Sequence, residues 1–187
     1  MRLFAAAFAA LLAAACSSGP ARTGYTPTPP RTAWIVNTAG APVGQATFTQ
    51  GPRGVLIRTE FNAAGLPPGW HGMHLHARGD CSDFAAGFQA SGGHVTTPQR
   101  PQHGLMNGLG PEAGDLPNIF APASGPFAAE VHTTLVTLMP IEAAPRPGLV
   151  DADGSALIFH AGPDDHFNQP IGGAGDRVAC AALTNLP

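Results

Sequence analysis

The sequence predicts an all-β domain, either a sandwich or a barrel. Short apolar or alternating runs rich in Val, Ile, Thr and Phe recur along the chain, and turn residues separate them. No stretch keeps a 3.6-residue apolar period over three turns, so no long helix is expected. With 187 residues, 44% hydrophobic and 11% charged, the chain has the length and composition of one domain with a packed core.

Residues 1–15 are predicted to be a signal peptide. Arg2 precedes an apolar run from Leu3 to Ala15 that is too short to span a bilayer. The small residues before Cys16 resemble a bacterial lipobox, in which the cysteine is acylated; the alternative is a plain signal cut nearby. Ser17 after Cys16 favours the outer membrane. We therefore expect a periplasmic or cell-envelope protein that meets the membrane only through a lipid anchor.

Residues 16–32 are rich in Pro and Ser and are predicted to be a lipidated tether, which leaves residues 33–187 as the domain. Three cysteines in an exported chain leave one unpaired. If Cys16 carries the lipid, Cys81 and Cys180 remain as a disulfide pair in an oxidising compartment.

The expected strands come in two groups, with turn segments such as AAGLPPG, APASG and DADG between them. The early runs are AWIVN, APVGQATFTQ, GVLIRTEFN and WHGMHLHA, and the late runs are FAAEVHTTLVTL, SALIFHA and RVACAAL. Two Gly/Pro-rich loops, residues 81–126 and 161–176, interrupt this pattern. Loops of such length in a compact domain are normally functional or disordered, and both contain His and Asp, which favours function.

A set of histidines is the strongest chemical signal. His74 and His76 stand at positions i and i+2 of an expected strand, so both imidazoles point to one face. His94 and His103 lie in the first long loop, and His160 ends a late strand; Asp115 follows in the first loop. Imidazole ligands suit copper or zinc, and a mixed His and Asp set suits zinc.

Five stretches together resemble the copper/zinc superoxide dismutase family of the bacterial exported type, from about residue 33 to 185. They are GWHGMHLHARGDCS, ASGGHVTTPQRPQHG, AGDLPN, IFHAGPDD and GGAGDRVACAAL. The resemblance implies a Greek-key β-sandwich or flattened barrel, immunoglobulin-like, with two long functional loops. It also implies an enzyme that converts superoxide to O₂ and H₂O₂ by cycling a copper ion. The alternative is a copper-binding protein of the same fold that serves storage or delivery, with little dismutase activity.

The resemblance implies the metal ligands by position. Copper would be held by His74, His76, His94 and His160, and zinc by His94, His103 and Asp115. His94 would bridge the two metals and deliver protons. Asp164 matches the carboxylate that links ligands of the two metals, and Arg177 matches the arginine that guides superoxide to copper. The pair Cys81 and Cys180 matches the family disulfide.

Glu112 departs from the family pattern, because it stands where the third zinc histidine is expected. Three arrangements are open: Glu112 binds zinc through oxygen, Glu112 points to solvent, or the zinc site is empty and the enzyme uses copper alone. A carboxylate is an acceptable zinc ligand, which favours the first.

The charge pattern bears on partners. The formal net charge is −3 and all nine basic residues are Arg, with no basic run. A nucleic-acid partner is therefore not expected, since binding to phosphates needs a basic patch or stripe. Superoxide is the expected partner, and the sequence carries no signal for the oligomeric state.

Overall fold

The computed structural model describes residues 27–63, 65–140 and 146–184. The predicted signal peptide, residues 1–15, and Cys16 with most of the 16–32 tether lie outside these residues. Within the described ranges, no helix is long and apolar enough to cross a membrane.

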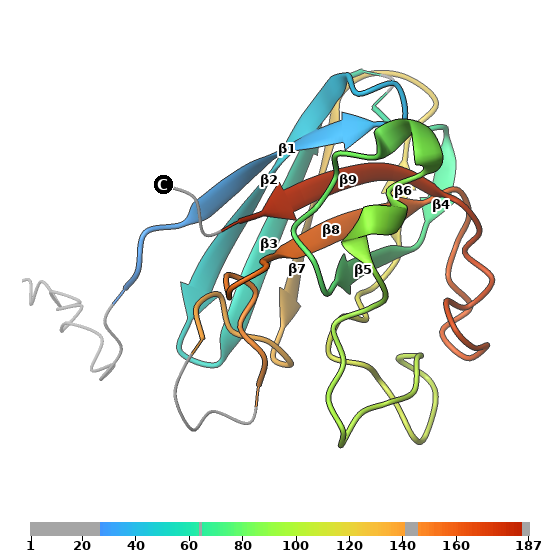
Figure 1. Cartoon of the computed structure of the whole chain (residues 1–187). Helices are drawn as coiled ribbons and strands as arrows, with labels where there is room; N and C mark the ends of the chain where they lie inside the picture. Colours follow the sequence, from blue (N-terminus) through green and yellow to red (C-terminus); the bar gives the residue numbers. More distant parts are fainter. Residues whose placement is uncertain (1–26, 64, 141–145, 185–187) are drawn as a thin grey trace, which may run out of the picture.

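The described residues form antiparallel strands and two short 3₁₀ turns (Figure 1). The strands are β1 (Arg31–Asn37), β2 (Pro42–Gly51), β3 (Gly54–Phe61), β4 (Gly69–His71), β5 (Met73–His76), β6 (Ile119–Ala121), β7 (Phe127–Thr133), β8 (Ser155–His160) and β9 (Arg177–Leu183). The turns are η1 (Phe84–Ala86) and η2 (Gln89–Ser91). Seven strands make one sheet in the order β5-β8-β9-β1-β2-β3-β7, and β4 pairs with β6.

The large sheet curls until its two halves face each other. The ring of Phe61 on β3 stacks on Phe127 with centroids 4.6 Å apart and meets Phe159 of β8 edge-on at 5.1 Å. Because β3 and β8 are four places apart in the sheet order, this contact crosses the core. Burying each such ring contributes roughly 1.5–3 kcal/mol. The predicted β-sandwich is confirmed, with its core between the two halves of the sheet.

Several strand boundaries differ from the prediction. The run WHGMHLHA divides into β4 and β5 at Gly72, whose amide donates to the Gly162 carbonyl at 2.8 Å instead of to a neighbouring strand. The run that starts at Phe127 leaves the sheet after Thr133. β1 starts at Arg31, two residues inside the segment predicted as a tether. The short strand β6 lies within the first long loop and was not predicted.

Strand β5 is buried on both faces, unlike the half-buried strand that an isolated sheet would give. Met73 and Leu75 belong to the main core, so alternation places His74 and His76 on the opposite face. The first long loop covers that face, where buried Phe88 packs with a small apolar cluster that includes residues of β8 and β9. The histidines are therefore held in the interior.

The predicted disulfide is present. Cys81 at the start of the long loop is bonded to Cys180 on β9, with Cα atoms 5.9 Å apart. The 99-residue separation implies a stabilisation on the order of 4 kcal/mol in the chain-entropy account. The bond ties the loop that covers the histidines to the sheet beneath it.

Candidate metal centre

The first long loop meets β5 along its free edge and brings distant residues together. β5 is an edge strand of the large sheet, so one side of its backbone is open for pairing. Isolated antiparallel bridges fill that side, one between His74 and Asp115 and another between His76 and His94. The loop ligands predicted from the sequence are thereby placed beside the two strand histidines.

Backbone hydrogen bonds fix this arrangement. The Leu75 amide donates to the Gly114 carbonyl at 2.8 Å, and the Val95 amide donates to the Leu75 carbonyl at 2.8 Å. The Gly114 amide closes the triangle on the Val95 carbonyl at 2.7 Å. A side chain at Gly114 would not fit, since its Cβ would lie 2.3 Å from the Leu75 carbonyl oxygen.

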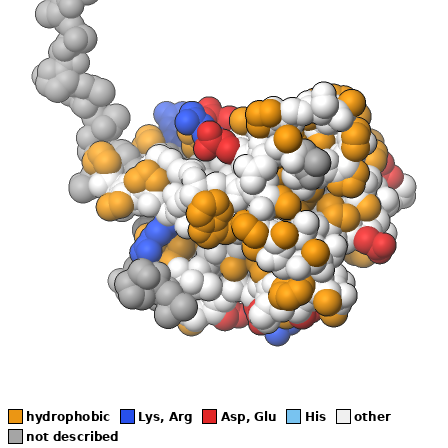
Figure 2. All heavy atoms as spheres, turned by 90° about the horizontal axis from the view of Figure 1, so that it is seen from above, with side chains coloured by type: hydrophobic (Ala, Val, Ile, Leu, Met, Phe, Trp, Pro, Cys, Tyr) orange, Lys and Arg blue, Asp and Glu red, His pale blue; other side chains and the backbone are white. Residues whose placement is uncertain are grey.

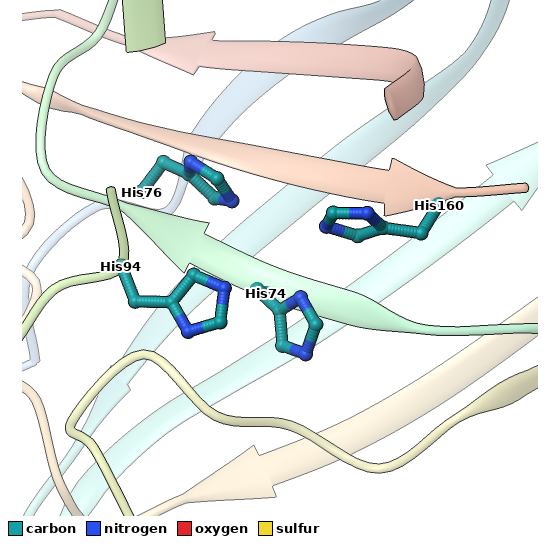
Figure 3. Close-up of side chains that lie close together, drawn as sticks. All are labelled: His74, His76, His94 and His160. Atoms are coloured by element: carbon teal, nitrogen blue, oxygen red, sulfur yellow. The ribbon is translucent and has the colours of Figure 1, made fainter. Parts of the chain in front are cut away.

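The rings of four buried histidines converge, two from β5, one from the loop and one from the end of β8 (Figure 3). They are His74, His76, His94 and His160, and one donor atom from each lies within 4.8 Å of the others. One buried nitrogen on each ring has no hydrogen-bond partner: His74 Nδ1, His76 Nε2, His94 Nε2 and His160 Nε2. Buried polar atoms are nearly always paired, so four unpaired nitrogens in one place indicate a cation site.

The second nitrogen of three of these rings is already engaged. His76 Nδ1 donates to the Gly92 carbonyl and His160 Nδ1 to the Gly175 carbonyl, each at 2.8 Å. His74 Nε2 contacts Asp164 Oδ2 at 2.9 Å. A neutral imidazole that donates from one nitrogen presents a lone pair at the other, so these contacts point lone pairs at the centre of the cluster.

Burial keeps these rings neutral. It lowers the pKa of His74 to about 4, the pKa of His76 to about 2 and the pKa of His160 to about 3. At neutral pH all three are therefore uncharged and free to bind a metal through nitrogen. The residues present fit copper, which favours imidazole nitrogen.

A second cluster adjoins the first and shares His94. Asp115 Oδ1 lies 2.7 Å from His103 Nδ1 and 3.3 Å from His94 Nδ1. His74, His94, His103 and Asp115 each offer a donor atom within 4.8 Å of the others, and all four residues are buried. Of these residues, His94 and His103 together with the Asp115 carboxylate form a donor set that fits zinc.

The charge state of this second cluster differs from that of the first. Burial lowers the pKa of His103, but the hydrogen bonds to Asp115 and Asp164 outweigh it and raise the pKa to about 10. Burial also lowers the pKa of His94, but the hydrogen bonds to Asp115 and Glu112 outweigh it, so the pKa of His94 is raised. Burial raises the pKa of Asp115, yet its bonds to His103 and His94 bring it below its ordinary value. Shared protons of this kind are what a divalent cation displaces.

Glu112 lies at this second cluster and not in solvent. Its Oε2 is 2.7 Å from His94 Nδ1, and its side chain is 15% exposed. It does not belong to the group whose donor atoms all lie within 4.8 Å of one another. The structure therefore places Glu112 in contact with Nδ1 of the shared histidine, whereas Nε2 is the unpaired nitrogen that belongs to the four-histidine cluster.

Asp164 joins the two clusters. Its Oδ2 contacts His74 Nε2 at 2.9 Å and its Oδ1 contacts His103 Nε2 at 3.1 Å. The Asn118 side chain accepts from the Asp164 amide at 2.9 Å and donates to the Asp164 carbonyl at 2.8 Å. The loop 161–176 thereby contacts one ring of each cluster through a single carboxylate.

Arg177 begins β9 and is paired with His160 across the β8–β9 ladder. Its Nη1 donates to the Phe88 carbonyl at 2.8 Å and to Ser91 Oγ at 3.1 Å, and its Nη2 donates to the Gly92 carbonyl at 2.8 Å. All three acceptors are neutral oxygens, so the contacts orient the guanidinium without cancelling its charge.

The residues that hold Arg177 were not predicted. Phe88 is fully buried with a φ of 57°, and this left-handed backbone is the conformation in which its carbonyl meets Arg177. Backbone acceptors such as those of Phe88 and Gly92 have no signature in a sequence. For Ser91, its place in the ASGGH stretch was the available signal.

Comparisons with known proteins agree with this geometry. The chain matches the protein family described as copper/zinc superoxide dismutase (SODC) over residues 43–183. It is 49% identical over 144 residues to a Cu-Zn superoxide dismutase of Caulobacter vibrioides, and the aligned region covers 77% of this chain and 79% of the relative. A Cu-Zn superoxide dismutase of Aquifex aeolicus is 39% identical over 150 residues, 80% of this chain and 83% of the relative.

A solved structure gives the same result. The crystal structure of a SOD-like protein from Bacillus subtilis superposes with a TM-score of 0.71 and 30% identity. The match covers 81% of this chain and 97% of that protein. The family match, the curated relatives and the paired histidine clusters lead to one conclusion: the chain belongs to the copper/zinc superoxide dismutase family.

Proposed function

We propose that the protein is a superoxide dismutase whose copper is held by His74, His76, His94 and His160. The observation that carries this proposal is the set of four buried imidazole nitrogens, one on each ring, that have no hydrogen-bond partner. Copper bound there would supply one-electron redox chemistry, by which two superoxide anions and two protons are converted into O₂ and H₂O₂.

Arg177 is proposed to attract and orient the superoxide anion. Its guanidinium is half-buried beside His160 and is held by three neutral oxygens, so its charge is available to a small anion. A fixed positive charge beside a metal site raises the encounter rate with an anion by about tenfold or more. Proton delivery is assigned to His94, whose Nε2 faces the other three rings and has no other partner.

A second metal, zinc, is proposed to bind His94, His103 and Asp115. Zinc accepts both imidazole and carboxylate ligands, and these three residues already share protons that a cation would replace. Asp164 is proposed to hold His74 and His103 in their metal-binding orientations. The role of Glu112 at this site is taken up in the next subsection.

The proposed location is the periplasm or cell envelope, in an outer-membrane-anchored lipoprotein. The support is the sequence itself, in which residues 1–15 have the pattern of a signal peptide, Cys16 follows small residues as an acylated cysteine does, and residues 16–32 have the composition of a tether. The disulfide between Cys81 and Cys180 supports an oxidising compartment. On the face that Figure 2 shows, charged side chains are few and scattered, which gives no support to a nucleic-acid partner.

A role in copper storage or delivery fits the residues less well. Storage needs the histidines but not a guanidinium held beside them, and Arg177 is placed by three hydrogen bonds at the edge of the cluster. A superoxide dismutase needs both the histidines and the guanidinium.

The proposal is tested by loading the purified chain with copper and zinc, counting both metals and measuring superoxide consumption. His160→Ala removes one of the four nitrogens, and His132→Ala, at an exposed position on β7, is the matched control. We expect one copper per chain, superoxide consumption by the wild type and the control, and its loss in His160→Ala. Stoichiometric copper with activity that is absent, or that does not depend on His160, would refute the proposal.

A further inference from the structure

The donor sets of the two clusters differ in a way that bears on how the protein sorts its metals. The copper cluster offers four imidazole nitrogens and no oxygen. The second cluster offers two imidazoles and the Asp115 carboxylate, and a second carboxylate, Glu112, stands against its shared histidine. The question is what completes the second donor set.

His74 is a poor candidate for the fourth ligand, although it lies within 4.8 Å of the second cluster. Its Nε2 is engaged by Asp164 at 2.9 Å, and its Nδ1 is one of the four unpaired nitrogens of the copper cluster. Both of its nitrogens are therefore committed elsewhere.

Asp115 does not complete the set alone. Its Oδ2 accepts hydrogen bonds from the Gly104 amide at 2.7 Å and the Glu112 amide at 2.9 Å. Only Oδ1 is left to meet a metal, so Asp115 supplies one ligand atom. The same bond from the Glu112 amide holds the Glu112 backbone beside the cluster.

Glu112 has the position and the room to be the fourth ligand. Its Oε2 is 2.7 Å from His94 Nδ1, which is itself 3.3 Å from Asp115 Oδ1, and Asp115 Oδ1 is 2.7 Å from His103 Nδ1. Tetrahedral zinc with bonds of about 2.0 Å sets its ligand atoms about 3.3 Å apart, and these three separations are close to that value. Glu112 stands outside the group whose donor atoms all lie within 4.8 Å of one another, so its carboxylate has to turn toward the metal to join the set. The side chain is partly exposed, so the carboxylate has space to turn toward the metal.

We propose that Glu112 is the fourth ligand of the second site and that the resulting pair of carboxylates makes this site discriminate against copper. The inference rests on the proposed function, which assigns copper to the first cluster and zinc to the second. Copper gains most from nitrogen and sulfur ligands, whereas carboxylate oxygens suit harder cations. Two nitrogens with two oxygens therefore favour copper less than the three imidazoles and one carboxylate that a histidine at position 112 would give.

The ligand role is tested on the metal-free full-length chain. Glu112→Gln keeps the shape of the side chain and removes its charge, and Glu112→His supplies a nitrogen ligand in its place. Glu60→Gln at an exposed position on β3 is the control.

 

The expected result is a loss of zinc affinity of at least about tenfold in Glu112→Gln, read by competition with a chromophoric chelator. The absorption of the cobalt(II) form should also lose the intensity typical of a four-coordinate site. Glu60→Gln should leave both readouts unchanged, and Glu112→His should keep tight zinc binding. Zinc affinity and a cobalt spectrum in Glu112→Gln that equal those of the wild type would overturn the ligand role.

Discrimination against copper is tested by titrating the same metal-free chains with copper(II) alone and counting the ions bound. The wild type is expected to bind one copper tightly, and Glu112→His is expected to bind a second at least about tenfold more tightly than the wild type does. Equal affinity of the two chains for a second copper would overturn the discrimination. Failure of the proposed function is a separate outcome, since it would appear as a wild type that binds no copper or consumes no superoxide.

Discussion

The second nitrogen of His94 faces two carboxylates. Gly92 and Gly175 offer neutral carbonyls to His76 and His160, and His74 contacts Asp164 alone, whereas His94 Nδ1 meets both Glu112 and Asp115. One nitrogen of this ring therefore faces each cluster, which is the arrangement that a bridging ligand requires. His74 and His76 could be predicted because strand alternation places i and i+2 on one face. Asp164, which contacts the second nitrogen of His74, was expected from the resemblance. The partner of the second nitrogen of His76 could not be predicted, because it is the backbone carbonyl of Gly92.

Replacement of Asp164 by Asn should weaken both metal sites. The substitution removes the carboxylate charge that holds His74 and His103 through separate oxygens. Partners of this kind contribute about 10- to 100-fold to metal affinity. Chelator competition for copper and zinc measures the effect, with Asp153→Asn at an exposed turn as the control. Unchanged affinities for both metals would show that Asp164 does not position the rings.

Replacement of Arg177 by Lys should slow superoxide consumption and leave the copper content unchanged. Lys keeps the positive charge but cannot reproduce the contacts of Nη1 and Nη2 with separate oxygens. We expect a decrease of about tenfold, with the dependence of the rate on ionic strength retained because the charge is kept. Superoxide consumption measured across a range of salt concentrations gives both values. A rate equal to that of the wild type would contradict the role assigned to Arg177.

At the scale of elements, the free edge of β5 decides how the site is assembled. The loop pairs with this edge through Val95 and Gly114, and the bridges set His94 beside His76 and Asp115 beside His74. The sequence predicted a strand and a long functional loop, and both are present. It did not predict how they meet, since the pairing depends on which strand lies at the sheet edge and on the absence of a side chain at Gly114.

Gly114→Ala tests this assembly. The added Cβ would lie 2.3 Å from the Leu75 carbonyl oxygen, so the loop segment has to move away from β5. We expect the free energy of unfolding to fall by about 1–3 kcal/mol and zinc binding to weaken. Gly108→Ala is the matched control, because a Cβ there meets nothing within 4 Å. Denaturant unfolding and zinc counting that agree between the two variants would contradict the account.

For the whole molecule, the two clusters give the metal-free chain opposite responses to pH. The folded-state pKa values of His74, His76 and His160 are about 4, 2 and 3, below the ordinary 6.5. Below pH 6.5 the unfolded chain therefore binds protons that the folded chain does not, and stability falls as the pH drops. The pKa of His103 is raised to about 10, and the pKa of His94 is also raised. The stabilisation that these two groups contribute is therefore present below pH 6.5 and is lost as the pH rises.

The metal-free chain should accordingly be most stable near pH 6.5 and less stable on either side. Denaturant unfolding between about pH 4.5 and pH 9 measures this profile. The copper- and zinc-loaded chain should show a flatter profile near neutral pH, because bound metals replace the protons that titrate. A stability that rises steadily across the whole range in the metal-free chain would contradict the charge states assigned to the clusters.

The overall architecture was predictable because its strands alternate and its turns carry Gly and Pro, and the sandwich follows once the apolar faces are buried together. The central claim is that four imidazole nitrogens on this sandwich form one copper site. Electron paramagnetic resonance of the copper(II)-loaded chain tests it most directly, through the nitrogen couplings of the bound ion. The account predicts one copper per chain coupled to four imidazole nitrogens, with one coupling lost in His160→Ala. A copper signal dominated by oxygen ligands, or one that is the same in His160→Ala, would contradict it.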